Sequence, residues 1–114
     1  MLYSEGVGRG RISLSRLIEV SSTNPAKLFG LYPRKGTIAV GSDADIIVFD
    51  PDLERVIEPA MLKSNADDSV YDGWRVKGWP LLTLLRGEIA YQDDQVVASP
   101  GSGQVLRCGA ASRL

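Results

Sequence analysis

The spacing of apolar residues changes near residue 36, and this change limits the folds open to the 114-residue chain. Before it, Leu14, Leu17 and Ile18 fall on one face of a helix that would run to about residue 21. Ser13 is suited to cap the first turn of that helix. A second short helix is predicted over Asn24–Gly30, which has a capping asparagine, a proline at the first position and a closing glycine.

After the basic turn Pro33–Gly36, the residues favour strands interrupted by glycine and proline. We expect Pro51 to stop the apolar run Ala44–Asp50, Gly87 to mark a bulge or tight bend, and Asp93-Asp94 to form a hairpin turn. Strands are predicted over 37–40, 44–50, 55–58, 75–79, 81–86, 88–91 and 95–98, with a loop or helical turn over about 60–71. The pattern indicates an α+β, strand-rich fold, with short N-terminal helices followed by a mostly antiparallel sheet.

The chain contains no histidine and a single cysteine, Cys108. Histidine is the commonest metal ligand and the base whose pKa lies nearest neutrality. Zinc sites draw mainly on Cys and His, and a Ser-His or Cys-His nucleophilic pair cannot be assembled here. We therefore expect no metal or nucleophile chemistry from this chain unaided. A lone cysteine also allows no internal disulfide, which fits a reducing cytoplasm.

The charge pattern argues against two classes of partner. A formal net charge of −1 offers neither a nucleic-acid footprint nor a basic stripe for an anionic membrane. No apolar run approaches the ~20 residues that cross a bilayer. The first residues also lack the basic and apolar regions of a secretory signal. We predict no nucleic-acid partner, no membrane association and a cytoplasmic location.

Several short patterns are compatible with a binding site, but each has a simpler interpretation. Asp43-Ala44-Asp45 resembles a metal-binding pair, yet an Asx-type turn at Asp43 and a strand starting at Asp45 are favoured. Gly6-x-Gly8-x-Gly10 lacks the preceding strand of a dinucleotide fingerprint. Trp74 and Trp79 could line a ligand groove, although packing in a core or an interface is favoured. The remaining pattern is a basic group that we interpret as a solvated surface: Arg9, Arg11, Arg34 and Lys35.

Two longer stretches are more specific. They are Asn24–Ile38, NPAKLFGLYPRKGTI, and Gly41–Pro51, GSDADIIVFDP. Together they resemble the C-terminal part of hydantoinases and dihydropyrimidinases, the cyclic amidohydrolases of the amidohydrolase superfamily. Val76–Pro80, Leu85–Glu88 and the segment from Tyr3 to Leu14 extend the resemblance over residues 2 to about 107.

The resemblance implies a fold and a missing catalytic region. Members of this family have a (β/α)8 barrel, two divalent metal ions, typically zinc, and a β-sandwich shared by both ends of the chain. The metal ions are held by a carboxylated lysine, four histidines and an aspartate, all of which precede the region matched here. We therefore expect no catalytic, cofactor-binding or metal-binding residue and no cofactor in this chain. The expected parts are barrel-packing helices at 1–36, a portion of the sandwich at 37–99 and a flexible tail at 100–114.

The resemblance also implies a reaction class. The parent hydrolases open C–N bonds of cyclic amides, and we expect this portion to be inactive alone, with no small-molecule substrate. An alternative is an independent β-rich module that assembles into homo-oligomers through its exposed sheet, without enzymatic activity. The sequence leaves open a relationship to the non-catalytic, dihydropyrimidinase-related neuronal branch of the family.

Overall fold

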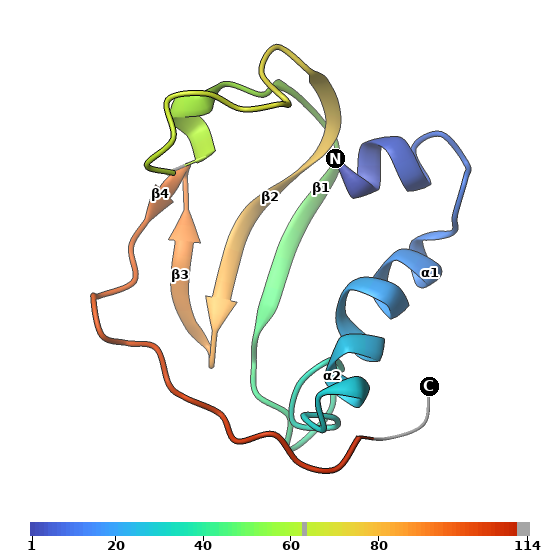
Figure 1. The fold of residues 1–114 in the computed structure, drawn as a ribbon, viewed down its shortest axis with the longest axis vertical. Helices are drawn as coiled ribbons and strands as arrows, with labels where there is room; N and C mark the ends of the chain where they lie inside the picture. The colour runs from blue at the N-terminus through green and yellow to red at the C-terminus, as the bar shows by residue number, and fades with distance from the viewer. Residues whose placement is uncertain (63, 112–114) are drawn as a thin grey trace.

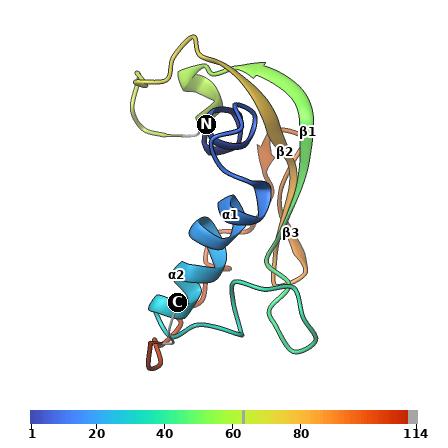
Figure 2. The same cartoon turned by 90° about the vertical axis from the view of Figure 1, so that its right-hand side faces the viewer.

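The computed structural model describes residues 1–62 and 64–111. They form a helical layer that lies beside one face of a single twisted sheet (Figures 1 and 2). The helical elements are η1 (Leu2–Val7), α1 (Leu14–Ile18), η2 (Glu19–Thr23), α2 (Asn24–Leu28) and the short η3 (Pro59–Leu62). The strands are β1 (Ile46–Val56), β2 (Arg75–Leu85), β3 (Glu88–Gln92) and β4 (Gln95–Val96).

The two predicted helices form one unbroken helical run. Ser13 caps it as expected, because its side chain accepts a 3.1 Å hydrogen bond from the backbone N–H of Arg16. An α-helix begins at Asn24 with Pro25 in its first turn, as predicted, but Asn24 does not cap it, because Asn24 is itself helical and its N–H binds the carbonyl of Glu19 in a wide, π-type turn. That turn adapts the helix to Pro25, which has no N–H to donate and whose ring would crowd a regular α-turn.

The sheet has four antiparallel strands in the order β1-β2-β3-β4, which confirms the predicted fold class. Two-residue turns join the last three strands, and both were predicted. Arg86 and Gly87 adopt φ of 52° and 84°, and Asp93 and Asp94 adopt φ of 50° and 59°. Such left-handed pairs match the twist of the strands that they connect.

Proline does not end the strands where the sequence predicts. β1 continues through Pro51 to Val56, and β2 runs through Gly78 and Pro80 without a break. The ladder is irregular between Asp50 and Glu54, where the side chain of Asp50 accepts hydrogen bonds from the N–H groups of Asp52 and Leu53. The missing N–H of Pro51 therefore falls where no ladder bond is required.

The strand predicted over 37–40 is wrong. This segment is irregular, and Ile38 and Val40 are largely exposed. Its β-prone residues have no neighbouring strand among the described residues. The segment predicted as a loop or helical turn over about 60–71 contains most of η3, and its residues 64–71 form no helix or strand. Residues 97–111 contain neither helix nor strand and turn once, where the N–H of Ser102 binds the carbonyl of Ser99; of the tail predicted over 100–114, residues 112–114 lie outside the described residues.

The apolar core is small. The buried hydrophobic residues of the described chain are Ala26, Ile57 and Val76. Helix η1 is held on the sheet by Tyr3, whose ring lies 4.8 Å from that of Phe49, while the N–H of Lys77 binds the hydroxyl of Ser4. No helix in the described residues is long and apolar enough to cross a bilayer.

Gly78→Ala tests the contact between η1 and the sheet. Gly78 has φ of 90°, and an added Cβ would overlap the ring of Tyr3 and lie 2.6 Å from Cζ of Phe49. We expect a loss of about 2–4 kcal/mol in the free energy of unfolding, from backbone strain and overpacking together. Urea denaturation measures it.

Gly41→Ala is the matched control for this prediction. Gly41 has φ of 91°, and a Cβ there would meet nothing within 4 Å. Its substitution should cost only the backbone strain, about 1–2 kcal/mol. An equal loss in the free energy of unfolding for Gly41→Ala and Gly78→Ala would show that crowding against Tyr3 and Phe49 adds nothing to the cost of the Gly78 substitution.

Candidate functional site

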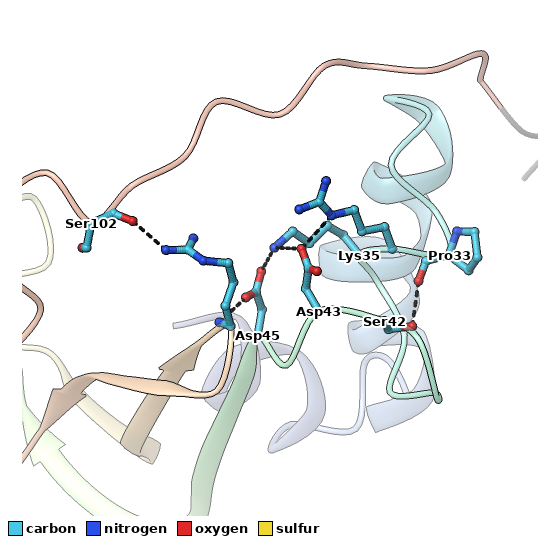
Figure 3. Close-up of polar contacts among 8 residues, drawn as sticks. Pro33, Lys35, Ser42, Asp43, Asp45 and Ser102 are labelled. Atoms are coloured by element: carbon cyan, nitrogen blue, oxygen red, sulfur yellow. Dashed lines mark hydrogen bonds and ion pairs between the residues drawn. The ribbon is translucent and has the colours of Figure 1, made fainter.

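A cluster of charged groups lies where the helical layer meets the sheet. Nζ of Lys35 binds the carboxylates of both Asp43, at 2.9 Å, and Asp45 (Figure 3). Nε of Arg34 lies 2.9 Å from the same Asp43 oxygen. Asp45 also accepts a 2.8 Å hydrogen bond from the backbone N–H of Arg86. The cluster thus joins the 33–36 turn, the start of β1 and the β2–β3 turn.

The cluster also holds the tail. The guanidinium of Arg86 donates a 2.6 Å hydrogen bond to the carbonyl of Ser102 (Figure 3). Ser42 binds the carbonyl of Pro33 through its hydroxyl at 2.8 Å, which closes the loop between the turn and β1. Farther along the tail, the N–H of Gly109 reaches the carbonyl of Gly30 at the end of the helical run.

The electrostatics of the cluster keep its members charged. Lys35 is mostly buried, with a side chain 17% exposed, and burial would lower its pKa, but hydrogen bonds to Asp43 and Asp45 outweigh that cost and raise it. Hydrogen bonds from Lys35 and Arg34 hold the pKa of Asp43 below its usual value. Burial would raise the pKa of Asp45, and its bonds to Lys35 and to the Arg86 N–H lower it. None of these three groups is therefore poised to exchange a proton near neutrality.

A second polar group lies on the sheet. Asp94 binds Arg55 at 2.7 Å and accepts a 2.9 Å hydrogen bond from the hydroxyl of Tyr91. The Arg55 guanidinium lies over the ring of Trp79, 5.5 Å from its centroid. The bonds from Arg55 and Tyr91 lower the pKa of Asp94, whereas burial and the bond to Asp94 raise that of Tyr91. This group fastens the β3–β4 turn to β1 and β2.

The tryptophans, glycines and basic residues that the sequence offers as possible binding patterns do not form a common site in the described residues. Trp79 packs within the sheet, while Trp74 is half exposed and stacks edge-on against Tyr71. The glycines at 6, 8 and 10 lie in and just after η1, and residues 1–10 contain no strand. The basic residues do not form one surface, because Arg9 pairs with Glu5 of η1, and η1 and the turn that follows α2 lie at opposite ends of the helical layer (Figure 1).

The Asx-type turn predicted at Asp43 is wrong, because the side chain of Asp43 has other partners. Its carboxylate binds two basic side chains in place of the backbone N–H groups of an Asx turn. Lys35 and Arg86 are the residues that sequence reasoning missed. The one available signal was the pairing of a basic dipeptide, Arg34-Lys35, with two alternating carboxylates about ten residues later.

The residues present do not fit a two-metal hydrolytic site. The whole chain has no histidine, and its one cysteine is exposed on the tail. Within residues 1–62 and 64–111, no three Cys, Asp or Glu side chains converge as metal ligands would. The neighbouring carboxylates of Asp43 and Asp45 both bind Lys35.

Comparison with known proteins places the chain in a family. The model of the Amidohydrolase family matches residues 1–90. The chain belongs to the amidohydrolase family. The resemblance of its sequence to hydantoinases and dihydropyrimidinases is confirmed by curated relatives. It is 48% identical over 107 residues to a D-hydantoinase of Geobacillus stearothermophilus, a match that covers 94% of this chain and 23% of that relative.

Further relatives support the same group. An L-hydantoinase of Paenarthrobacter aurescens is 43% identical over 106 residues, covering 93% of this chain and 23% of its own length. Among solved structures, a dihydropyrimidinase from Brevibacillus agri superposes with a TM-score of 0.95 at 42% identity, over 99% of this chain and 24% of that one. The chain thus spans about a quarter of the length of these relatives.

Lys35→Met tests the role of the charged cluster. Removing the ammonium leaves the negative charges of Asp43 and Asp45 without the positive charge that both of them bind. We expect a loss of about 2 kcal/mol in the free energy of unfolding at pH 7. The lowered pKa values of both carboxylates mean that their stabilisation is present above about pH 4 and is lost as pH falls through the folded-state pKa. Because the pKa of Lys35 is raised in the folded chain, the stabilisation that its charged form contributes is lost only above about pH 10.5.

Urea midpoints between pH 2.5 and 7 measure this dependence. The wild-type midpoint should fall as the solution is acidified below about pH 4, and the Lys35→Met variant should show a flatter acid limb. Lys27→Met is the matched control, because Lys27 contacts the ring of Tyr32 and pairs with no carboxylate in the described chain. An acid limb of unchanged slope in Lys35→Met would contradict the assignment.

Proposed function

We propose that this chain is the non-catalytic C-terminal portion of a hydantoinase- or dihydropyrimidinase-like hydrolase, and that it is inactive alone. The parent class would act on C–N bonds of cyclic amides. The observation that carries the proposal is a combination of two findings: 94% of this chain matches a D-hydantoinase, and the described residues do not form a site for two metal ions. The match covers only about a quarter of the relative, which leaves room for a separate catalytic region.

The ionisable groups support the same proposal. Hydrolytic ring opening requires a group that activates water and one that stabilises charge developing on the carbonyl oxygen. In this chain the perturbed groups Lys35, Asp43 and Asp45 neutralise one another, and Asp94 is held by Arg55. Their role is to fix the positions of turns and strands, and the contribution of this portion to a hydrolase would be structural.

A second candidate function is self-assembly through the sheet. It is supported by large apolar side chains of the sheet that face solvent, among them Ile47, Leu81 and Val96. Monomeric proteins rarely leave broad apolar patches uncovered. The single cysteine fits a reducing compartment such as the cytoplasm for either function.

A turnover assay tests the proposed lack of activity. The purified chain, supplied with Zn²⁺, should open neither hydantoin nor dihydrouracil above the rate of zinc-containing buffer. The D-hydantoinase of Geobacillus stearothermophilus, assayed on hydantoin under the same conditions, serves as the positive control. Ring opening by this chain that a chelator abolishes would overturn the proposal.

A further inference from the structure

Arg86 carries a positive charge that no carboxylate balances in the described residues. It is one of two half-buried arginines there, and the other, Arg55, lies 2.7 Å from the carboxylate of Asp94. Arg86 takes part in no ion pair within residues 1–62 and 64–111. Its guanidinium donates a 2.6 Å hydrogen bond to a neutral acceptor, the carbonyl of Ser102. Because charged groups that leave water are normally paired, this guanidinium is suited to an anionic partner.

The backbone around Arg86 is fixed by the β2–β3 turn. The N–H of Arg86 binds the side chain of Asp45 at 2.8 Å, and the N–H of Gly87 binds the carbonyl of Ala44 at 3.0 Å. These two bonds tie the turn to the chain just before β1. A side chain that projects from a turn so constrained is partly positioned for a ligand before the ligand binds.

A cavity of about 240 Å³ lies beside Arg86. Arg86 and Leu85 line it from the β2–β3 turn, and Lys35 lines it from the 33–36 turn. Gln104 and Leu106 line it from the tail. The cavity is smaller than the roughly 300–1,000 Å³ of sites for drug-sized ligands, which limits its occupant to a small molecule.

The charges around the cavity favour an anion. Asp43 is also part of the wall, but Arg34 and Lys35 both bind its carboxylate, and Lys35 binds Asp45 as well. The positive charges of Arg34, Lys35 and Arg86 therefore exceed the negative charges of the two aspartates by one. A guanidinium can bind a carboxylate or a phosphate through two parallel N–H groups, and such charge-assisted bonds are stronger than a bond to a neutral carbonyl.

The tail covers one side of the cavity. It is attached to the rest of the chain at Ser102, through Arg86, and at Gly109, whose N–H binds the carbonyl of Gly30 at 3.2 Å (Figure 3). Gln104 and Leu106 lie between these two attachments. The contact at Gly30 leaves no space for a side chain, because a Cβ there would overlap the carbonyl of Gly109. The tail is thus docked beside the cavity at a defined position.

We propose that this cavity is a binding site for a small oxyanion, a carboxylate or a phosphate, which Arg86 binds through its guanidinium while the tail covers the bound anion. The site goes beyond the proposed function, because it requires neither a metal ion nor activity toward a cyclic amide. A carboxylate occupant would connect the two, since hydrolysis of a cyclic amide produces a carboxylate.

Isothermal titration calorimetry of the purified chain at pH 7 tests the proposal. The two probes are inorganic phosphate and N-carbamoylglycine, the carboxylate that opening of hydantoin forms, and NaCl keeps the ionic strength constant. We expect one anion per chain, with a Kd of about 1 mM or lower for at least one probe. Tighter binding of N-carbamoylglycine would support a site for the product of the proposed reaction, and tighter binding of phosphate would support a site for phosphate groups.

Arg86→Met tests the residue that is proposed to bind the anion. The substitution removes the guanidinium and keeps the backbone N–H that binds Asp45, and the Kd should rise by about tenfold or more. Arg75→Met is the matched control. It removes an exposed arginine at the opposite end of β2 and should leave the Kd unchanged.

Leu106→Asp tests the site without changing Arg86. The new carboxylate would lie in the wall of the cavity and compete with the added anion, so the Kd should again rise by about tenfold or more. Val105→Asp adds the same charge one residue earlier, at a position that is 97% exposed and outside the lining of the cavity. Its Kd should change by about twofold at most, because solvent and salt screen an exposed charge.

The remaining outcomes would overturn the proposal. They are the absence of binding by either anion up to about 20 mM, a Kd that Arg86→Met leaves unchanged, and equal weakening by Arg75→Met or Val105→Asp. Urea denaturation shows whether each variant folds like the parent chain, and if either Arg86→Met or Leu106→Asp fails to fold, the other decides. Ring opening by the chain alone would contradict the proposed function and leave the anion site standing.

Discussion

The ion pairs of Lys35 with Asp43 and Asp45 fix one end of the junction between the two layers of this chain. Only three apolar side chains are buried in the described residues, so hydrophobic packing does not lock the helical run against the sheet. The junction is instead polar, and it joins the turn after the helices, the start of β1 and, through Arg86, the β2–β3 turn and the tail. Partly buried ion pairs of this kind position segments more than they stabilise them.

The polar junction and the exposed apolar side chains occur together. Charged bonds at one end and the Tyr3–Phe49 contact at the other hold the helical layer beside the sheet. Ile18 and Phe29 of the helical run and Ile47 of β1 remain 51%, 58% and 63% exposed. If the chain is, as proposed, one portion of a longer hydrolase, these side chains would be covered by the rest of that polypeptide.

Local features of the fold were predictable because they depend on one or two neighbouring residues. The cap at Ser13 and the tight turns at Arg86-Gly87 and Asp93-Asp94 follow from side-chain chemistry and backbone preference. The failures depend on partners distant in sequence. A β-prone segment such as 37–40 becomes a strand only beside another strand, and Pro51 is tolerated because β2 leaves that position unpaired. The ion pairs of Lys35 could not be predicted for the same reason, because its partners Asp43 and Asp45 lie in another loop.

Pro51 has a consequence for the behaviour of this chain at high concentration. β1 is an edge of the sheet, and an edge offers free N–H and C=O groups on which strands of other molecules can stack into fibrils. Pro51 removes a donor, and the irregular ladder between Asp50 and Glu54 bends that edge halfway along its length. The missing donor and the irregular ladder make the β1 edge a poorer template for such growth than a regular strand would be.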